Sequence, residues 1–277
     1  MKLSALAKRN LHGDRNVQGK QWKTAVDGYW HSAKSAKDFI RLCRQELNAL
    51  PDAPRVLELG SADGFLGESV CAYLRSKGKR PHLTLVDMSK AHLRENKHKH
   101  TRKIQADLLT LNLTKTAGHF DLILMRSVLH YFPSAELQIQ VLKRVRRHLA
   151  HGGVFLNQAF IAATPEESKL RSASRATTRK VGLRYMPYHR DVPRFYAKAG
   201  FTNMRNLGDM PLVHPSLASL IRRSDLTRAD IQRTRARYAL VPARLRPHLT
   251  LTKTAFKRTI PYKVYAATRP PSRLKRA

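Results

Sequence analysis

The chain has 277 residues, of which 42% are hydrophobic, and its 53 Lys and Arg against 19 Asp and Glu give a formal net charge of +34. This size and apolar content exclude a largely disordered chain and permit one large or two ordinary domains. The charge predicts anionic partners, such as RNA, an anionic membrane face or an acidic small molecule, although an Arg-rich background composition is an alternative interpretation.

The two cysteines, Cys43 and Cys71, do not support a disulfide framework, and no Cys/His group has metal-ligand spacing, so no metal is predicted. No apolar run approaches the roughly 18 residues that a membrane span requires. We therefore expect a cytoplasmic protein in a reducing compartment. The basic start of the chain, which has no acid before Asp14, leaves an organelle transit peptide as an alternative.

Residues 1–50 predict a basic N-terminal helical cap, because Phe39, Cys43, Leu47 and Leu50 recur at three- and four-residue steps before Pro51. Short apolar strands then alternate with amphipathic helices, a pattern typical of a parallel sheet covered on both faces. We predict strands at 55–59, 82–87, 102–107, 120–126 and 152–160, and helices at 65–77, 88–98 and 135–149.

The C-terminal part predicts a helix at 190–199 that ends at Gly200, a strand from Phe201 and a final strand at 261–267. Between these elements we expect two basic insertions, at 161–186 and 210–258, within one domain that spans residues 51–268. A Pro/Arg/Lys tail at 269–277 is expected to be disordered.

The stretch from Val56 to Gly67 is an apolar strand that leads into a Gly-containing turn and then a helix, which is the pattern of a ligand cradle. A dinucleotide fingerprint would need glycines where Ala62 and Phe65 stand, so NAD and FAD are disfavoured. A P-loop would need Lys and Ser or Thr after Gly64, so ATP bound by that route is excluded.

The segment Glu58-Leu59-Gly60-Ser61-Ala62-Asp63-Gly64 resembles the first motif of the class I S-adenosylmethionine-dependent methyltransferases. Ala62 replaces the middle glycine of that motif. We expect this change to be tolerated only if Ala62 does not need a positive φ and its methyl group does not touch the cofactor.

The resemblance continues in order along the chain. Val86-Asp87 ends the second strand with a carboxylate for the ribose hydroxyls, Asp107 beside Leu108 fits an adenine site, and 120–132 fits the fourth strand and its loop. Taken alone, a strand-end Asp is more often a turn or capping residue.

The resemblance implies a Rossmann-like, doubly wound α/β sheet of about seven mostly parallel strands with an antiparallel last strand. It also implies S-adenosyl-L-methionine as cofactor, held by the following residues: Glu58, Gly60, Ser61, Ala62, Gly64, Asp87, Met88, Asp107, Leu108, Arg126 and Ser127.

His130, in the loop after the fourth strand, is the candidate general base because imidazole titrates near neutrality, with a purely structural histidine as the alternative. Tyr131 is the second candidate catalytic residue and forms a substrate wall. The Arg126-Ser127-Val128-Leu129 loop lacks the motif associated with methylation of exocyclic base amines. The absence of a Pro-Cys pair there argues against cytosine C5 methylation.

Ligands of open α/β sheets bind beyond the carboxyl ends of the strands, so the two insertions can form a basic lid over an anionic acceptor. Solvated helix faces remote from the pocket are the alternative. The lid candidates are Arg171, Arg175, Arg179, Lys180, Arg222 and Arg223.

Two functions remain open from the sequence. The first is a methyltransferase that acts on an anionic small molecule or an RNA-associated acceptor. The second is a catalytically inactive RNA-binding or assembly factor that keeps the fold, which the substitution at Ala62 favours and the intact acidic motif residues oppose. The oligomeric state is not predicted.

Overall fold

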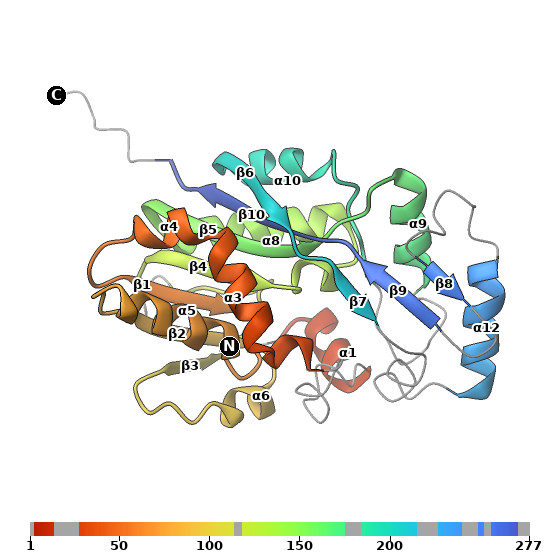
Figure 1. The fold of residues 1–277 in the computed structure, drawn as a ribbon, viewed down its shortest axis with the longest axis horizontal. Coiled ribbons are helices and arrows are strands. Elements are labelled where there is room, and N and C mark those ends of the chain that lie inside the picture. The colour runs from red at the N-terminus through yellow and green to blue at the C-terminus, as the bar shows by residue number, and fades with distance from the viewer. Residues whose placement is uncertain are drawn as a thin grey trace.

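A seven-stranded sheet forms the centre of the molecule (Figure 1). The computed structural model describes residues 3–13, 28–113, 118–174, 184–214, 227–239, 249–251 and 256–270. The strand order is β3-β2-β1-β4-β5-β10-β6. These strands are β1 (Arg55–Leu59), β2 (His82–Asp87), β3 (Arg102–Gln105), β4 (Phe120–Arg126), β5 (Leu149–Phe160), β6 (Thr202–Asp209) and β10 (Tyr262–Thr268).

The directions of the strands create a crevice at one edge of the sheet. β1 pairs in parallel with both β2 and β4, and β10 alone runs antiparallel, between β5 and β6. The chain winds outward in one direction from β1 to β3 and in the other from β4 onward. The carboxyl ends of β1 and β4 therefore meet at the topological switch point, where ligands of open α/β sheets bind.

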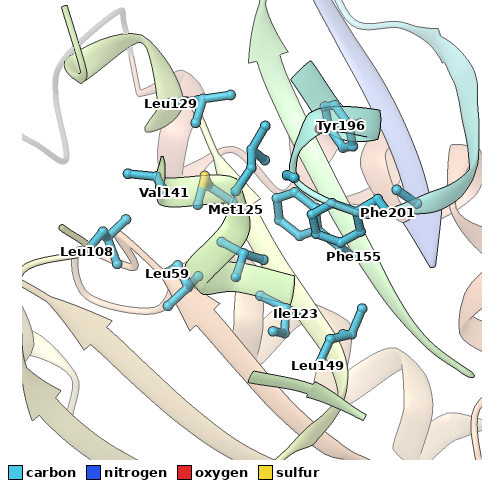
Figure 2. Close-up of a cluster of buried hydrophobic side chains, with 14 of the residues drawn as sticks. Leu59, Leu108, Ile123, Met125, Leu129, Val141, Leu149, Phe155, Tyr196 and Phe201 are labelled. Carbon is cyan, nitrogen blue, oxygen red and sulfur yellow. The ribbon is translucent and has the colours of Figure 1, made fainter. Parts of the chain in front are cut away.

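Helices cover both faces of the sheet because the buried residues of each central strand alternate between the two faces. On one face, Leu57 and Ile123 pack with α8 (Ala135–His148) and α10 (Val192–Lys198). Figure 2 shows this cluster, in which Val141 of α8 and Tyr196 of α10 lie over Met125 and Phe155. The opposite face contacts these helices: α3 (Ala33–Leu42), α4 (Arg44–Asn48), α5 (Phe65–Ser76) and α6 (Lys90–Glu95).

The N-terminal part is divided between two places. Phe39 and Leu47 of α3 and α4 are fully buried against the sheet. The first helix, α1 (Ala5–Gly13), instead lies near the carboxyl edge of the sheet, below α3 in Figure 1. The short helix η1 (Tyr29–His31) leads into α3 and buries Trp30 against Phe160 and Tyr262.

The second insertion contains a small sheet of its own. β7 (Leu212–His214) follows β6 directly, and β9 (Phe256–Ile260) leads directly into β10. They pair with each other and with β8 (Leu249–Leu251) as a small sheet ordered β7-β9-β8, beside α12 (Arg228–Ala239) (Figure 1). The insertion therefore begins and ends as strands that prolong β6 and β10.

The predicted fold is confirmed. All predicted strands are present, with β3 ending two residues early at Gln105 and β5 starting three residues early at Leu149. Gly200 ends α10 at a φ of +83°, as expected of a helix stop. Among the described residues, no helix is long and apolar enough to span a membrane.

The structure describes only part of the expected C-terminal tail and of the expected basic lid. Arg269, assigned to the tail, donates to the Leu149 carbonyl at 2.6 Å, whereas residues 271–277 lie outside the described part. Five of the six lid candidates also lie outside it, namely Arg175, Arg179, Lys180, Arg222 and Arg223.

Candidate cofactor and acceptor site

An open cavity lies at the carboxyl ends of β1, β2 and β4. Its walls come from the turn after β1, the ends of β2 and β3, the loop after β4, and α1. The lining residues are Leu6, Ala7, Asn10, Gly60, Ala62, Asp87, Met88, His92, Ala106, Asp107, Leu108, Arg126, Ser127, Val128, Tyr131 and Phe132.

The turn after β1 brings its backbone close to the cavity. Gly60 has a φ of +63°, and a Cβ atom there would lie 2.4 Å from Val128 Cγ2, so only glycine fits. Ala62 has a φ of +50° and lines the cavity. The condition stated for tolerating Ala62, that it does not need a positive φ, is therefore not met: the turn places this residue in the left-handed conformation, which costs alanine roughly 1–2 kcal/mol.

Glu58 supports this turn from behind the cavity. Its Oε2 atom accepts the Gly67 amide of α5 at 2.9 Å, and only 3% of the residue is exposed. Burial raises the pKa of the carboxyl from 4.5 to about 8, against the opposing effects of the Arg126 charge and the Gly67 amide. Glu58 therefore carries a proton at neutral pH, and it acts on the cavity through the turn that it holds.

Asp87, at the end of β2, links two turns at the cavity wall. Its Oδ2 atom accepts the Ala62 amide at 2.9 Å and its Oδ1 atom accepts the Ser89 amide at 2.8 Å. Each carboxylate oxygen has more than one acceptor site, so both can still accept from a ligand. Asp87 is thus fixed in orientation, and Met88 lines the cavity beside it.

Asp107 follows β3 and is held in a similar way. Its Oδ1 atom accepts the Leu109 amide at 2.9 Å, and its Oδ2 atom accepts the Ser4 amide at 2.9 Å. Ser4 also caps α1, because its hydroxyl accepts the Ala7 amide at 3.1 Å. The carboxylate therefore anchors the positive end of α1 at this end of the cavity.

The loop after β4 contributes a buried cation. Arg126 is 8% exposed, donates from Nη2 to the Trp30 carbonyl at 2.8 Å, and lies 5.3 Å from the Trp30 ring centroid. Burial lowers its pKa, against the stabilising charge of Glu58. Ser127 follows with a φ of +59°, and its hydroxyl lies 2.6 Å from the Tyr262 hydroxyl. Both residues line the cavity.

The two candidate catalytic residues lie on the short helix η2 (Leu129–Tyr131) and face different surroundings. Tyr131 lines the cavity, and the Arg184 guanidinium stacks on its ring, with Cζ 3.7 Å from the centroid. His130 does not line the cavity; it is 6% exposed and lies between Tyr131 and Phe160, with ring centroids 4.7 Å and 6.2 Å away.

The first insertion contributes buried arginines near this wall. Arg171 of α9 (Pro165–Ser174) is 5% exposed, pairs with Glu167 at 2.5 Å and lies over the Phe160 ring at 5.3 Å. Arg184 is 3% exposed. Arg171, the one lid candidate that the structure describes, is therefore buried near the active face and is not on a solvated helix face.

The cavity brings together most of the predicted cofactor residues. Three of them, Glu58, Ser61 and Gly64, lie outside the lining and shape the turn behind it. The sequence analysis missed the α1 residues Leu6, Ala7 and Asn10, because nothing in their local pattern indicates which part of the sheet the helix contacts. It also missed Val128 and Phe132, although their positions beside Ser127 and Tyr131 were a usable signal.

Comparison with known proteins identifies a domain within the chain and the fold of the whole. Residues 57–155 match the family described as "Methyltransferase domain". The fold is shared with the YcgJ protein of Bacillus subtilis at 13% identity and a TM-score of 0.70, over 85% of this chain and 99% of that one. It is also shared with a candidate methyltransferase of Bacillus halodurans at 14% identity and a TM-score of 0.69, over 84% and 99% of the two chains. No curated protein matches the sequence.

A third structure, Haemonchus contortus phosphoethanolamine N-methyltransferase 2, shares the fold at 13% identity and a TM-score of 0.56, over 98% of this chain and 60% of that one. The family match, these structures and the strand order agree with one another. Residues 57–155 form a methyltransferase domain, and the chain has the fold of the class I S-adenosylmethionine-dependent methyltransferases. It is thus an enzyme whose methyl donor is S-adenosylmethionine.

Proposed function

We propose that this enzyme transfers the methyl group to an anionic acceptor that binds against Tyr131, between the cofactor and the arginines of the first insertion. The observation that carries the proposal is the buried Arg184 guanidinium stacked on a ring that lines the cavity. Buried arginines are rare and costly, and guanidinium groups suit planar recognition of carboxylates and phosphates.

The donor side of the cavity fits S-adenosylmethionine. Asp87 offers acceptors for the ribose hydroxyls, Asp107 offers one for the adenine amino group, and Ala106 and Leu108 supply an apolar surface for a ring. Arg126 is placed to bind the carboxylate of the methionine part of the donor. When bound, the donor supplies a methyl group on a cationic sulfur.

The acceptor side differs in charge from the donor side. The Arg171 guanidinium lies over the Phe160 ring, and the Arg184 guanidinium lies over the Tyr131 ring. The His130 ring contacts both of these rings. Glu167 neutralises Arg171 in part. The fold accommodates a phosphate-bearing acceptor in Haemonchus contortus phosphoethanolamine N-methyltransferase 2, whose structure contains phosphomonomethylethanolamine and S-adenosylhomocysteine. An acidic small molecule and an RNA-associated group share this anionic chemistry.

Tyr131 and His130 have separate roles in this proposal. Tyr131 forms the wall that aligns the acceptor with the methyl group, because alignment supplies most of the catalysis in a displacement of this kind. His130 supports Tyr131 through ring contact and remains the candidate general base in this proposal.

Labelled methyl transfer tests the proposal. Nuclease-treated protein is incubated with methyl-labelled S-adenosylmethionine and either total RNA or a mixture of phosphorylated amines and carboxylic acids. We expect Arg184→Gln to raise the acceptor KM by about tenfold or more while the donor Kd stays unchanged, because a charged hydrogen bond contributes about 1.5–3 kcal/mol. Arg190→Gln, which removes the same charge from an exposed site nearby, is the matched control.

Two outcomes contradict the proposal. Donor binding with no transfer to either acceptor pool favours the inactive RNA-binding factor. Transfer to a neutral acceptor that Arg184→Gln does not weaken contradicts the anionic site.

A further inference from the structure

The N-terminal helix α1 forms a wall of the cavity at its Asp107 end. Leu6, Ala7 and Asn10 line the cavity from this helix. Ala7 is 4% exposed, and Leu6 packs against the main hydrophobic cluster. The hydrogen bond from the Ser4 amide to Asp107 fixes the start of the helix at the same place. The helix therefore forms the wall beside the place where the adenine ring of a bound cofactor would lie.

Asn10 is the polar residue in this otherwise apolar stretch of wall. It is 3% exposed, and its Oδ1 atom has no hydrogen-bond partner among the described residues. A buried acceptor without a partner is costly, so such a group in a cavity wall indicates a ligand that completes its hydrogen bonding. Ala106 and Leu108, at the same end of the cavity, offer it no side-chain donor.

We infer that Asn10 is a further cofactor-binding residue that recognises the adenine ring of S-adenosylmethionine together with Asp107. The inference rests on the proposed donor site. An asparagine amide matches the edge of adenine, because its oxygen accepts from the N6 amino group while its NH₂ group donates to a neighbouring ring nitrogen. The amino group has two hydrogens, so one can reach Asn10 and the other Asp107.

This arrangement selects for an amino group on the ring. In a base that carries a carbonyl oxygen in place of the amino group, that oxygen would face the acceptor oxygens of Asp107 and Asn10. An ionised carboxylate has no hydrogen to donate, so the carbonyl oxygen would receive no hydrogen bond from Asp107. Sites that hydrogen-bond a polar group reject analogues that lack it, because their own buried groups are left unpaired. Asn10 thus contributes to specificity for adenine as well as to affinity.

The test compares S-adenosylhomocysteine with S-inosylhomocysteine, in which a carbonyl oxygen replaces the amino group. Dissociation constants are measured by calorimetry for the wild type and for Asn10→Leu, which keeps the side-chain size. We expect the variant to bind S-adenosylhomocysteine about tenfold more weakly, which corresponds to about 1.4 kcal/mol, and S-inosylhomocysteine almost as before. Lys8→Leu, an exposed change on the same helix, is expected to behave as the wild type.

The ratio of the two affinities separates a direct contact from a packing role. If Asn10 only holds α1 in place, Asn10→Leu weakens both ligands equally, the ratio is unchanged, and the inference is overturned. Asn10→Ser, too short to reach the ring, replaces the leucine variant if that variant loses thermal stability. If the wild type binds neither ligand, the proposed donor site fails and the inference fails with it; an unchanged ratio with an intact wild type overturns the inference alone.

Discussion

The side of the cavity that we propose binds the donor, around Asp87 and Asp107, and the side that we propose faces the acceptor, around Tyr131, are built in different ways. They are called the donor wall and the acceptor wall below. On the donor wall, Gly60 and Asp107 follow β1 and β3 within two residues, and Asp87 ends β2. Asp87 also accepts the Ala62 amide, and Asp107 accepts the Ser4 amide at the start of α1. On the acceptor wall, Tyr131 comes from the loop after β4, whereas Arg184, which stacks on it from outside the lining residues, comes from the end of the first insertion. The strand ends therefore place the main donor residues at the cavity, whereas the acceptor wall depends on tertiary packing.

The two walls also differ in how charge is stabilised. Backbone amides hold the carboxylates of the donor wall, at 2.8–2.9 Å for Asp87. Aromatic rings cover the guanidinium groups of the acceptor wall. An amide is available wherever the backbone turns, whereas a ring must be brought from elsewhere in the chain. Substitutions on the donor wall should thus act through the turns as much as through the ligand.

The largest effect is expected where the donor turn contacts the loop after β4. Gly60→Ala combines a left-handed φ of +63° with a Cβ position 2.4 Å from Val128. We expect a loss of roughly 2–5 kcal/mol in the free energy of unfolding, measured by denaturant titration, and loss of donor binding.

Two controls separate the backbone cost of this change from the contact cost. Gly78→Ala has a similar φ of +79° but open space around the Cβ position, so it should cost only about 1 kcal/mol. Val128→Ala in the Gly60→Ala background should recover the part of the lost unfolding free energy that is due to the contact between Cβ and Val128. Equal losses for the two glycines would show that Val128 does not constrain the turn.

Asp87→Asn tests the donor wall at the ligand itself. The change keeps the size of the side chain but removes the charge that two backbone amides bind and that we propose the ribose hydroxyls bind as well. We expect S-adenosylmethionine to bind about 100-fold more weakly in calorimetry, because charged hydrogen bonds contribute about 1.5–3 kcal/mol each. Asp121→Asn is the control, since Asp121 accepts a backbone amide of Arg55 at the amino end of β4, remote from the cavity. A similar loss in both variants would point to a general effect on stability.

The contrast between the walls also explains what the sequence could predict. The strands, their order and the residues at their ends follow from local periodicity and motif spacing, so Asp87 and Asp107 were found correctly at the cavity. Asn10 and Arg184 could not be predicted in this way, because their roles depend on where α1 and the first insertion pack. Ala62 was misjudged because residue type shows a preference for a φ value and not the φ that a turn imposes.

Glu58, behind the donor wall, makes the stability of the protein depend on pH. Burial raises its pKa from 4.5 to about 8, so the folded protein keeps a proton that the unfolded chain releases near pH 4.5. Its contribution to stability is therefore complete below about pH 4.5 and is lost as the pH rises through 8.

Glu58→Gln removes this titration while it keeps an acceptor for the Gly67 amide. Between pH 6 and 8, we expect the wild type to lose about 2 kcal/mol more than the variant, measured by denaturant titration at each pH. Subtracting the two profiles cancels the contribution of every group that titrates alike in both proteins. Parallel profiles would contradict the raised pKa.

The smallest expected effect is a gain in stability from Ala62→Gly. It tests whether backbone strain in the donor wall lowers the stability of the protein. Ala62→Gly relieves a φ of +50° at a position where the Cβ atom gives nothing back to the fold except its own burial. We expect the variant to be more stable by about 1 kcal/mol, a rise of a few degrees in Tm, with donor affinity equal to or above that of the wild type.

Ala91→Gly makes the same chemical change on the exposed side of α6, where it should cost up to about 1 kcal/mol because glycine weakens a helix. Opposite signs for the two substitutions would establish that the turn imposes the conformation at Ala62. If both destabilise, the methyl group of Ala62 contributes packing that outweighs the strain, and the departure from the family's glycine is then an adaptation of the donor wall.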